Sequence, residues 1–225
     1  MLKMKKAKIG ILMLDTQFYR PAGDIGNKHT FPFSVVYKMV EGASISKVVK
    51  ERDTGLIEPF VQAAKELEEE GIRAITTSCG FLALFQKEIQ QQLTVPFYSS
   101  SLLQIPMASI TAGEPIGIVT ASESSLTTAH LSGVNAHHQH VIIKGMDNMP
   151  KFSGAIVHEE IELNEAAVKE EMKQITSELI SSHPGLKAII LECTNMPPYR
   201  DAIREVTKLP IFDITTLVNY VYLTI

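Results

Sequence analysis

The chain has 225 residues, of which 45% are apolar and 20% are charged, and its formal net charge is −4. This length supports one large domain or two small ones with a real core. The slightly acidic balance excludes the basic footprint of a nucleic-acid-binding protein, and no apolar run approaches the length that spans a bilayer.

The N-terminus carries Lys3, Lys5, Lys6 and Lys8 ahead of the apolar stretch 9–14, which closes on Asp15. This stretch is too short for a secretory leader and no small-residue cleavage site follows it, so we expect a first strand there. We therefore expect a cytoplasmic protein, in which thiols stay reduced and the two cysteines form no structural disulfide.

Apolar runs of strand length alternate with segments of helical period along the chain. The expected strands are residues 8–15, 72–77, 95–98, 116–120, 141–144, 186–191 and 210–214. The expected helices are residues 57–70, 81–93, 102–112, 124–131, 165–181 and 199–207, with a short one at the C-terminus. Such alternation predicts an α/β fold with mostly parallel sheets, whose ligands bind at the carboxyl ends of the strands.

The two halves of the chain repeat one pattern. Each reads helix, strand, a cysteine-containing junction and helix, with the junctions TTSCG and LECTN around Cys79 and Cys193. The pattern predicts two similar Rossmann-like domains with a cleft between them, a usual place for a site. The predicted division is 1–101 with 208–225 for the first domain and 102–207 for the second.

Each cysteine follows an apolar strand and precedes a helix start. A helix N-terminus favours the thiolate, and its N–H groups also suit a bound carboxylate. Gly80 leaves room for a close approach beside Cys79. Free cysteines are often core residues, so buried structural roles are the alternative. Neither cysteine belongs to a CxxC pair, which argues against a metal site.

The motifs TTSCGF and ECTNMPPY, each after an apolar strand, resemble the two cysteine motifs of the aspartate/glutamate/hydantoin racemase superfamily. The resemblance implies two similar α/β domains and an active site in the cleft, without pyridoxal phosphate or metal. It implies that Cys79 and Cys193 form an acid/base pair on opposite faces of the α-carbon of a small carboxylic acid. Because relatives are often dimers, a homodimer is one expectation.

The resemblance also indicates substrate-binding residues. Hydroxyl, amide and N–H donors beside the cysteines would stabilise an enediolate. The candidates next to the cysteines are Ser78, Gly80, Thr194 and Asn195, and those at other strand ends are Asp15 and Thr120.

Two departures from the racemase pattern leave the reaction open. Many glutamate and aspartate racemases carry Cys-Asn-Thr where this chain has Cys79, Gly80 and Phe81, and Asn195 stands where glutamate racemases place histidine. The leading hypothesis is a racemase or isomerase of an amino acid or related small carboxylate. The alternatives are an enzyme similar to maleate isomerase or arylmalonate decarboxylase, and a non-catalytic small-ligand binder.

Two further features have no assigned role at this stage. His130, His137, His138 and His140 cluster in the sequence, but their spacing matches no zinc pattern. The turn-rich segment 20–27 (RPAGDIGN) follows the first strand, where a substrate loop or lid is often found. It lacks the spacing and lysine of a phosphate-binding loop.

Overall fold

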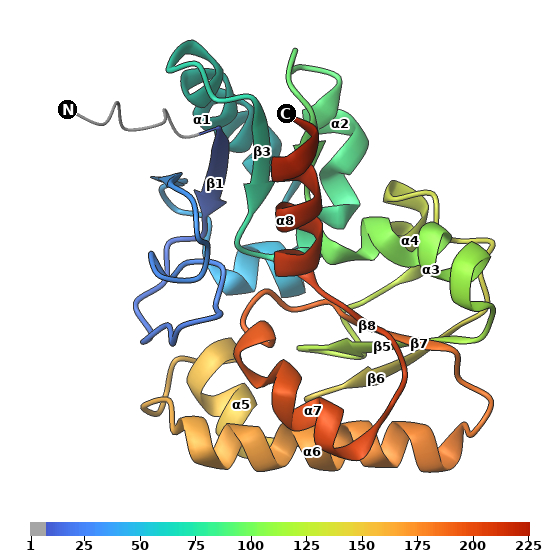
Figure 1. Ribbon diagram of the computed structural model, residues 1–225. Helices are drawn as coiled ribbons and strands as arrows, with labels where there is room; N and C mark the ends of the chain where they lie inside the picture. The colour runs from blue at the N-terminus through green and yellow to red at the C-terminus, as the bar shows by residue number, and fades with distance from the viewer. Residues whose placement is uncertain (1–7) are drawn as a thin grey trace.

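The computed structural model describes residues 8–225 and contains two units, each built on a four-stranded sheet (Figure 1). The strand orders are β2-β1-β3-β4 and β6-β5-β7-β8, and every pairing among the described residues is parallel. The predicted α/β fold with two similar halves is therefore confirmed. The lysines at positions 3, 5 and 6 lie outside the described residues.

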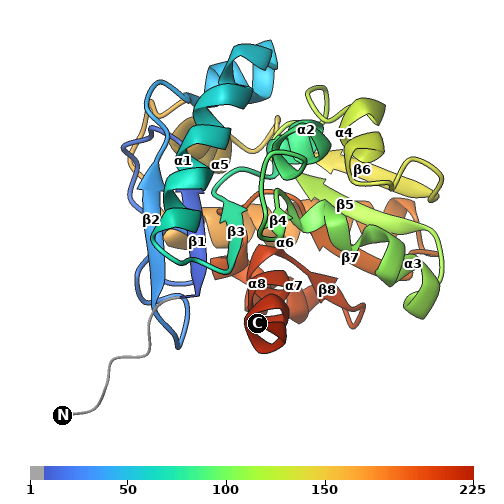
Figure 2. The same ribbon diagram turned by 90° about the horizontal axis from the view of Figure 1, so that it is seen from above.

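The first unit packs helices on both faces of its sheet. Its elements are β1 (Ile9–Met13), β2 (Val35–Met39), η1 (Ser46–Glu51), η2 (Thr54–Leu56), α1 (Ile57–Glu69), β3 (Ala74–Thr77), η3 (Gly80–Phe85), α2 (Gln86–Gln90) and β4 (Phe97–Tyr98). Side chains alternate along β1, so Leu12 joins the core under α1 whereas Ile9 and Ile11 pack against the C-terminal helix α8 (Ile214–Thr224). Seen from above, α1 and α8 lie on opposite sides of β1 and β3 (Figure 2).

The second unit repeats this plan. Its elements are η4 (Ser101–Gln104), α3 (Ile105–Ala112), β5 (Ile116–Thr120), α4 (Thr128–Gly133), β6 (Val141–Gly145), α5 (Pro150–Phe152), η5 (Ser153–Val157), α6 (Glu165–Ser182), β7 (Ala188–Leu191), η6 (Pro197–Tyr199), α7 (Arg200–Val206) and β8 (Ile211–Phe212). The central strands β5 and β7 are buried along their whole length, with α3 and α6 packed against β5.

The chain returns to the first unit later than the sequence suggested. Ile211 pairs with Ile189 of β7, so the strand after residue 208 belongs to the second sheet. The crossing falls at Asp213, which caps the N-terminus of α8 and binds the Arg200 guanidinium. The predicted division at 208 thus needs this correction, because β8 completes the second sheet before α8 covers the first.

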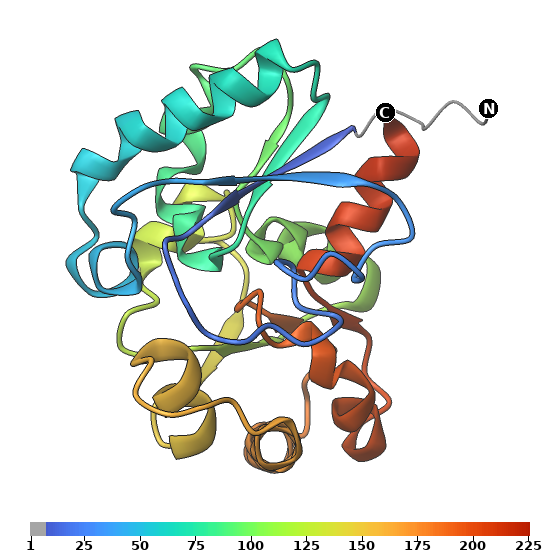
Figure 3. The same ribbon diagram turned by 90° about the vertical axis from the view of Figure 1, so that its left-hand side faces the viewer.

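Three local differences from the expected elements bear on the site. The expected helix over 81–93 is a 3-10 turn, η3, followed by the short helix α2. The edge strand β2 and the turn η5 were not expected from the sequence. Figure 3 shows the long segment after β1 running between the two units, where Ile25 N–H donates to the Thr194 carbonyl. No helix within residues 8–225 is both long and apolar enough to cross a membrane.

Candidate active site

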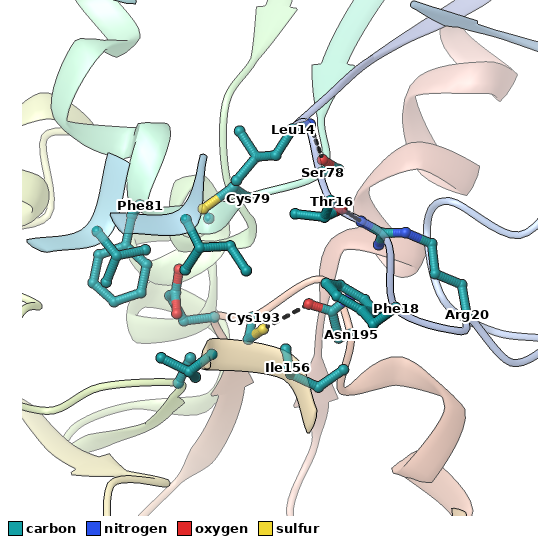
Figure 4. A pocket seen from close by; sticks show the side chains of 16 residues that line it. Leu14, Thr16, Phe18, Arg20, Ser78, Cys79, Phe81, Ile156, Cys193 and Asn195 are labelled. Carbon is teal, nitrogen blue, oxygen red and sulfur yellow. Dashed lines mark hydrogen bonds between the residues drawn. The ribbon is translucent and has the colours of Figure 1, made fainter. Parts of the chain in front are cut away.

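A pocket lies between the two units, at the carboxyl ends of the central strands of both sheets (Figure 4). Leu14 follows β1, Cys79 follows β3, Ala121 follows β5 and Cys193 follows β7, and all four line the pocket. Its cavity volume is about 40 Å³. This is the position that the parallel topology of the two sheets predicts.

The Cys79 thiol faces the pocket from the first unit. Cys79 occupies the N-cap position of η3 in an extended conformation (φ −147°, ψ 117°). This backbone turns the N–H groups of Phe81 and Leu82 toward the sulfur, which lowers the thiol pKa. Burial and the nearby Glu192 carboxylate outweigh these bonds and raise the pKa of Cys79 to about 12. A pKa raised this far favours the protonated thiol at neutral pH.

The Cys193 thiol faces the same pocket from the second unit (Figure 4). It is 9% exposed and donates to Asn195 Oδ1 at 3.3 Å. Burial raises the pKa of Cys193 well above its ordinary value, and the charge of Glu192 raises it further. The backbone N–H groups that follow each cysteine lower the pKa of its thiol, as a thiolate-favouring junction requires, but burial outweighs them and the pKa of both thiols is raised.

Glu192 is a buried carboxyl group beside both cysteines that the sequence analysis missed. Its exposure is 0%, its Oε2 accepts from Thr120 Oγ1 at 2.8 Å, and Ala121 N–H donates to it. Its Oε1 has no hydrogen-bond partner among residues 8–225. Burial raises the pKa of Glu192 to about 7. The available signal was an acidic residue directly after the apolar run AIIL.

Gly80 is where the first unit touches Glu192. A Cβ atom at position 80 would lie 2.2 Å from Glu192 Oε1 and 2.3 Å from the Glu192 carbonyl oxygen. Nearby, Thr194 Oγ1 donates to the Ser78 carbonyl oxygen at 2.6 Å. The two cysteine junctions are thus in direct contact, which holds the two thiols in one pocket.

Arg20 is the one cationic side chain of the described chain that lines this pocket. Its guanidinium donates to Asp24 Oδ1 at 3.0 Å and to Thr16 Oγ1 at 2.8 Å, and it lies 4.3 Å from the centroid of the Phe18 ring. Asp24 is fully buried and also accepts from Asn195 Nδ2 at 2.6 Å. The turn-rich segment after β1 therefore supplies a fixed arginine, a residue that sequence reasoning did not single out.

The rest of the pocket wall is apolar. Ile45 and Val49 come from around η1, Phe81 comes from η3, and Ile156 and Val157 come from η5. The apolar part of the wall can hold alkyl groups, and the polar side chains of Arg20, Thr16, Ser78 and Asn195 also line the pocket.

The predicted substrate contacts fall into two groups. Ser78, Gly80 and Asn195 line the pocket beside the cysteines. Thr120 and Thr194 are fully buried and bind Glu192 and Ser78 instead. Asp15 is exposed on the surface, and the next residue, Thr16, is the one that lines the pocket. Contact of these residues with a substrate stays a prediction.

The histidine cluster does not converge on one point. The rings of His137 and His138 lie 3.8 Å apart, whereas His130 is buried with its ring edge-to-face against Phe81. Within the described residues, no group of three His, Cys, Asp or Glu side chains could hold a metal ion.

Two parallel α/β units thus place one cysteine each in a shared pocket. The family model described as Asp/Glu/Hydantoin racemase matches residues 100–218. The chain belongs to this family, as the cysteine motifs predicted.

The curated relatives that match most of the chain are lyases. "Dimethylsulfoniopropionate lyase 3" of Emiliania huxleyi (strain CCMP1516) is 28% identical over 94% of this chain and 58% of its own length. The "Dimethylsulfoniopropionate lyase" of Durusdinium sp. clade D is 29% identical over 93% of this chain and 72% of its own length. The chain thus spans about three fifths of the length of the Emiliania relative.

Solved structures share the fold at low identity. An aspartate racemase homologue from Pyrococcus horikoshii OT3 has a TM-score of 0.56 and 16% identity, covering 92% of this chain and 93% of that one. The Gly74Cys mutant of arylmalonate decarboxylase has a TM-score of 0.56 and 14% identity, covering 90% of this chain and 86% of that one. At these identities the likeness shows the fold alone.

Proposed function

We propose that this chain is a cofactor-independent enzyme that removes a proton from the α-carbon of a small carboxylate and eliminates dimethyl sulfide from dimethylsulfoniopropionate. The observation that carries the proposal is the pairing of Cys79 and Cys193 across one small pocket that also holds Arg20. The lyase relatives, which match nearly the whole chain, support elimination as the outcome.

The pocket has a region suited to each end of dimethylsulfoniopropionate. The Arg20 guanidinium, fixed by Asp24 and Thr16, is suited to bind the carboxylate. The apolar wall around Phe81 and Ile156 is suited to the two S-methyl groups. A substrate bound in this way has its α-carbon in the middle of the pocket, which both thiols face.

Cys79 is the better candidate for the base. Its sulfur accepts two backbone N–H bonds, from Phe81 and Leu82, whereas Cys193 accepts one and donates its own proton to Asn195. Cys79 first loses its thiol proton to water; the resulting thiolate takes the α-proton, and that C–H electron pair forms the new C=C bond. The bond from the β-carbon to sulfur breaks, its electron pair leaves with neutral dimethyl sulfide, and acrylate remains. Negative charge on the carboxylate in the transition state is stabilised by Arg20.

Two-base racemisation or isomerisation is the second candidate, and one observation favours it. Cys193 lies opposite Cys79, where it could return a proton to the other face of the same carbon. A lyase needs a single base, so the two reactions differ in how much they depend on Cys193.

The proposal extends to where the protein works. Because thiolate chemistry requires reduced cysteines, we expect the chain to act in the cytoplasm. A homodimer also stays a prediction, resting on the family resemblance alone.

The test is an assay of dimethyl sulfide release together with α-proton exchange by NMR in D₂O. The substrates are dimethylsulfoniopropionate, both enantiomers of aspartate and glutamate, maleate and an arylmalonate. We expect release from dimethylsulfoniopropionate, loss of release and exchange in Cys79→Ser, and a slower but measurable release in Cys193→Ser. The two cysteines act as matched controls for each other.

Other outcomes would decide against elimination. Exchange of an amino acid without dimethyl sulfide release, lost in both variants, would establish the two-base reaction instead. If the folded protein neither releases dimethyl sulfide nor exchanges any α-proton, both proposed reactions are wrong.

A further inference from the structure

Glu192 carries an unused acceptor in the wall of the pocket. The side chain is fully buried and lines the pocket, and its Oε1 finds no donor anywhere in the described part of the chain. Its other oxygen is fixed by Thr120, and the close contact with Gly80 leaves the carboxyl group no room to turn away. A buried acceptor without a partner is costly, so a positively polarised ligand group placed beside it would offset that cost.

The charges around the pocket indicate that this ligand group is positively charged. The titratable and charged groups that line it with Glu192 are Cys79, Cys193 and Arg20. Arg20 is already paired with the buried Asp24. An ionised Glu192 opposes the formation of either thiolate, since its charge raises the pKa of both cysteines. The carboxylate therefore hinders the proposed base unless a positive charge cancels it.

We propose that Glu192 binds the positively charged group of a β-onium carboxylate, so that the substrate cation both fits the pocket and activates the thiol. This inference rests on the proposed function. A sulfonium or quaternary ammonium group has no N–H to donate, and a buried anion attracts it through charge alone. With the cation beside Glu192, the opposition to the Cys79 thiolate is removed. The thiol thus becomes a base only when substrate is bound.

The experiment measures binding without turnover. The probes are β-trimethylammoniopropionate and its uncharged isostere with carbon in place of nitrogen, and the measurement is isothermal titration calorimetry. Wild type should prefer the cationic probe by about tenfold or more, the low end for a close charge pair. Glu192→Gln keeps the shape and the Thr120 contact, and should bind the two probes equally. Glu69→Gln removes the same charge from the exposed end of α1 and should behave as wild type.

The pH dependence of the wild type tests the same inference without a variant. Preference for the cationic probe should grow as pH rises from 5 through about 7, where Glu192 ionises, while the neutral probe changes little. No preference in wild type, or equal weakening of both probes in Glu192→Gln, would overturn the cation site.

The binding readout separates the two proposals. Release of dimethyl sulfide without a preference for the cationic probe would overturn the Glu192 inference alone. A preference for the cationic probe without release of dimethyl sulfide would overturn the lyase reaction and support the cation site.

Discussion

At the scale of single residues, the site depends on how closely Gly80 approaches Glu192. The contact joins the turn after β3 to the end of β7, so it ties the Cys79 junction to the Cys193 junction. One partner in the contact is the Glu192 main-chain oxygen, which cannot rotate away as a side chain could. Gly80 is therefore required for packing between the units, in addition to any contact with substrate.

Gly80→Ala should destabilise the protein by about 1–3 kcal/mol, the usual cost of overpacking. The added methyl group would meet oxygen atoms at 2.2 and 2.3 Å, so η3 or the end of β7 must shift. Gly185→Ala is the matched control, because apart from Gly185 and its two chain neighbours no residue of the described chain comes within 4 Å of its added Cβ, and it should change stability by less than about 0.5 kcal/mol. Urea unfolding of both variants checks this. Equal stabilities would show that the two junctions can move apart freely.

Some of these residues could be found from the sequence and others could not. Cys79 and Cys193 were predictable because each follows an apolar strand, and parallel sheets bring such positions to one edge. Arg20 was not predictable, since it lies in a long connection whose path depends on the buried Asp24. Asp15 was predicted one residue too early, because only the next side chain, Thr16, lines the pocket.

At the scale of elements, the apolar wall of the pocket depends on a contact made by α6. Glu171 of α6 accepts from the N–H groups of Lys151 and Phe152 at 2.8 and 2.7 Å. These are free N–H groups at the start of α5, which a carboxylate satisfies well. The turn η5 continues directly from α5 and carries Ile156 into the pocket. The long helix thus fixes a short segment that has little stability of its own.

Glu171→Gln should lower the free energy of unfolding by about 1–3 kcal/mol, because an amide has one acceptor oxygen and leaves one buried N–H group without a partner. It should also weaken substrate binding, since the wall at Ile156 loosens. Glu170→Gln changes the neighbouring residue, which is 68% exposed at its side chain, and should stay within about 0.5 kcal/mol of wild type. Thermal and urea unfolding measure the difference. Equal losses in the two variants would rule out a specific role for the Glu171 cap.

The elements were predicted best where burial is most complete. The strand at 116–120 and the helix from residue 165 were found nearly to the residue, because one is a continuous apolar run and the other has a clear amphipathic period. The edge strand β2 was missed, since its residues are half-exposed and show no such run. The helix expected over 81–93 is broken because its first turn is 3-10, with Leu82 N–H bonded to the Cys79 carbonyl.

At the scale of the whole molecule, burial shifts the pKa values of two side chains in opposite directions. Burial lowers the pKa of His130 to about 4, and burial raises the pKa of Glu192 to about 7. His130 Nδ1 accepts from Thr127 N–H in the cap of α4, so a proton on that nitrogen would break the cap. The second unit thus places two ionisable side chains, one in α4 and one directly after β7, in environments that favour their neutral forms.

The two groups should make opposite contributions to stability between pH 7 and pH 5. His130 has a folded pKa below its unfolded 6.5, so its contribution is present above pH 6.5 and is lost as pH falls toward 4. Glu192 has a folded pKa above its unfolded 4.5, so its contribution is present below pH 4.5 and is lost as pH rises through 7. Each change amounts to about 2 kcal/mol over this interval, and the two nearly cancel.

Urea unfolding at pH 7 and pH 5 should therefore give similar stabilities for the wild type and opposite slopes for two variants. His130→Asn keeps an acceptor for Thr127 N–H but does not titrate in this range, so Glu192 alone acts and the protein should be more stable at pH 5 than at pH 7. In Glu192→Gln, His130 is the one of the two groups that still titrates, so this variant should be less stable at pH 5 than at pH 7. The double variant should again have similar free energies of unfolding at pH 7 and pH 5. This result would show that the slopes of the single variants come from these two groups and not from the exposed carboxylates. Parallel slopes in all four proteins would show that neither buried group sets the pH dependence.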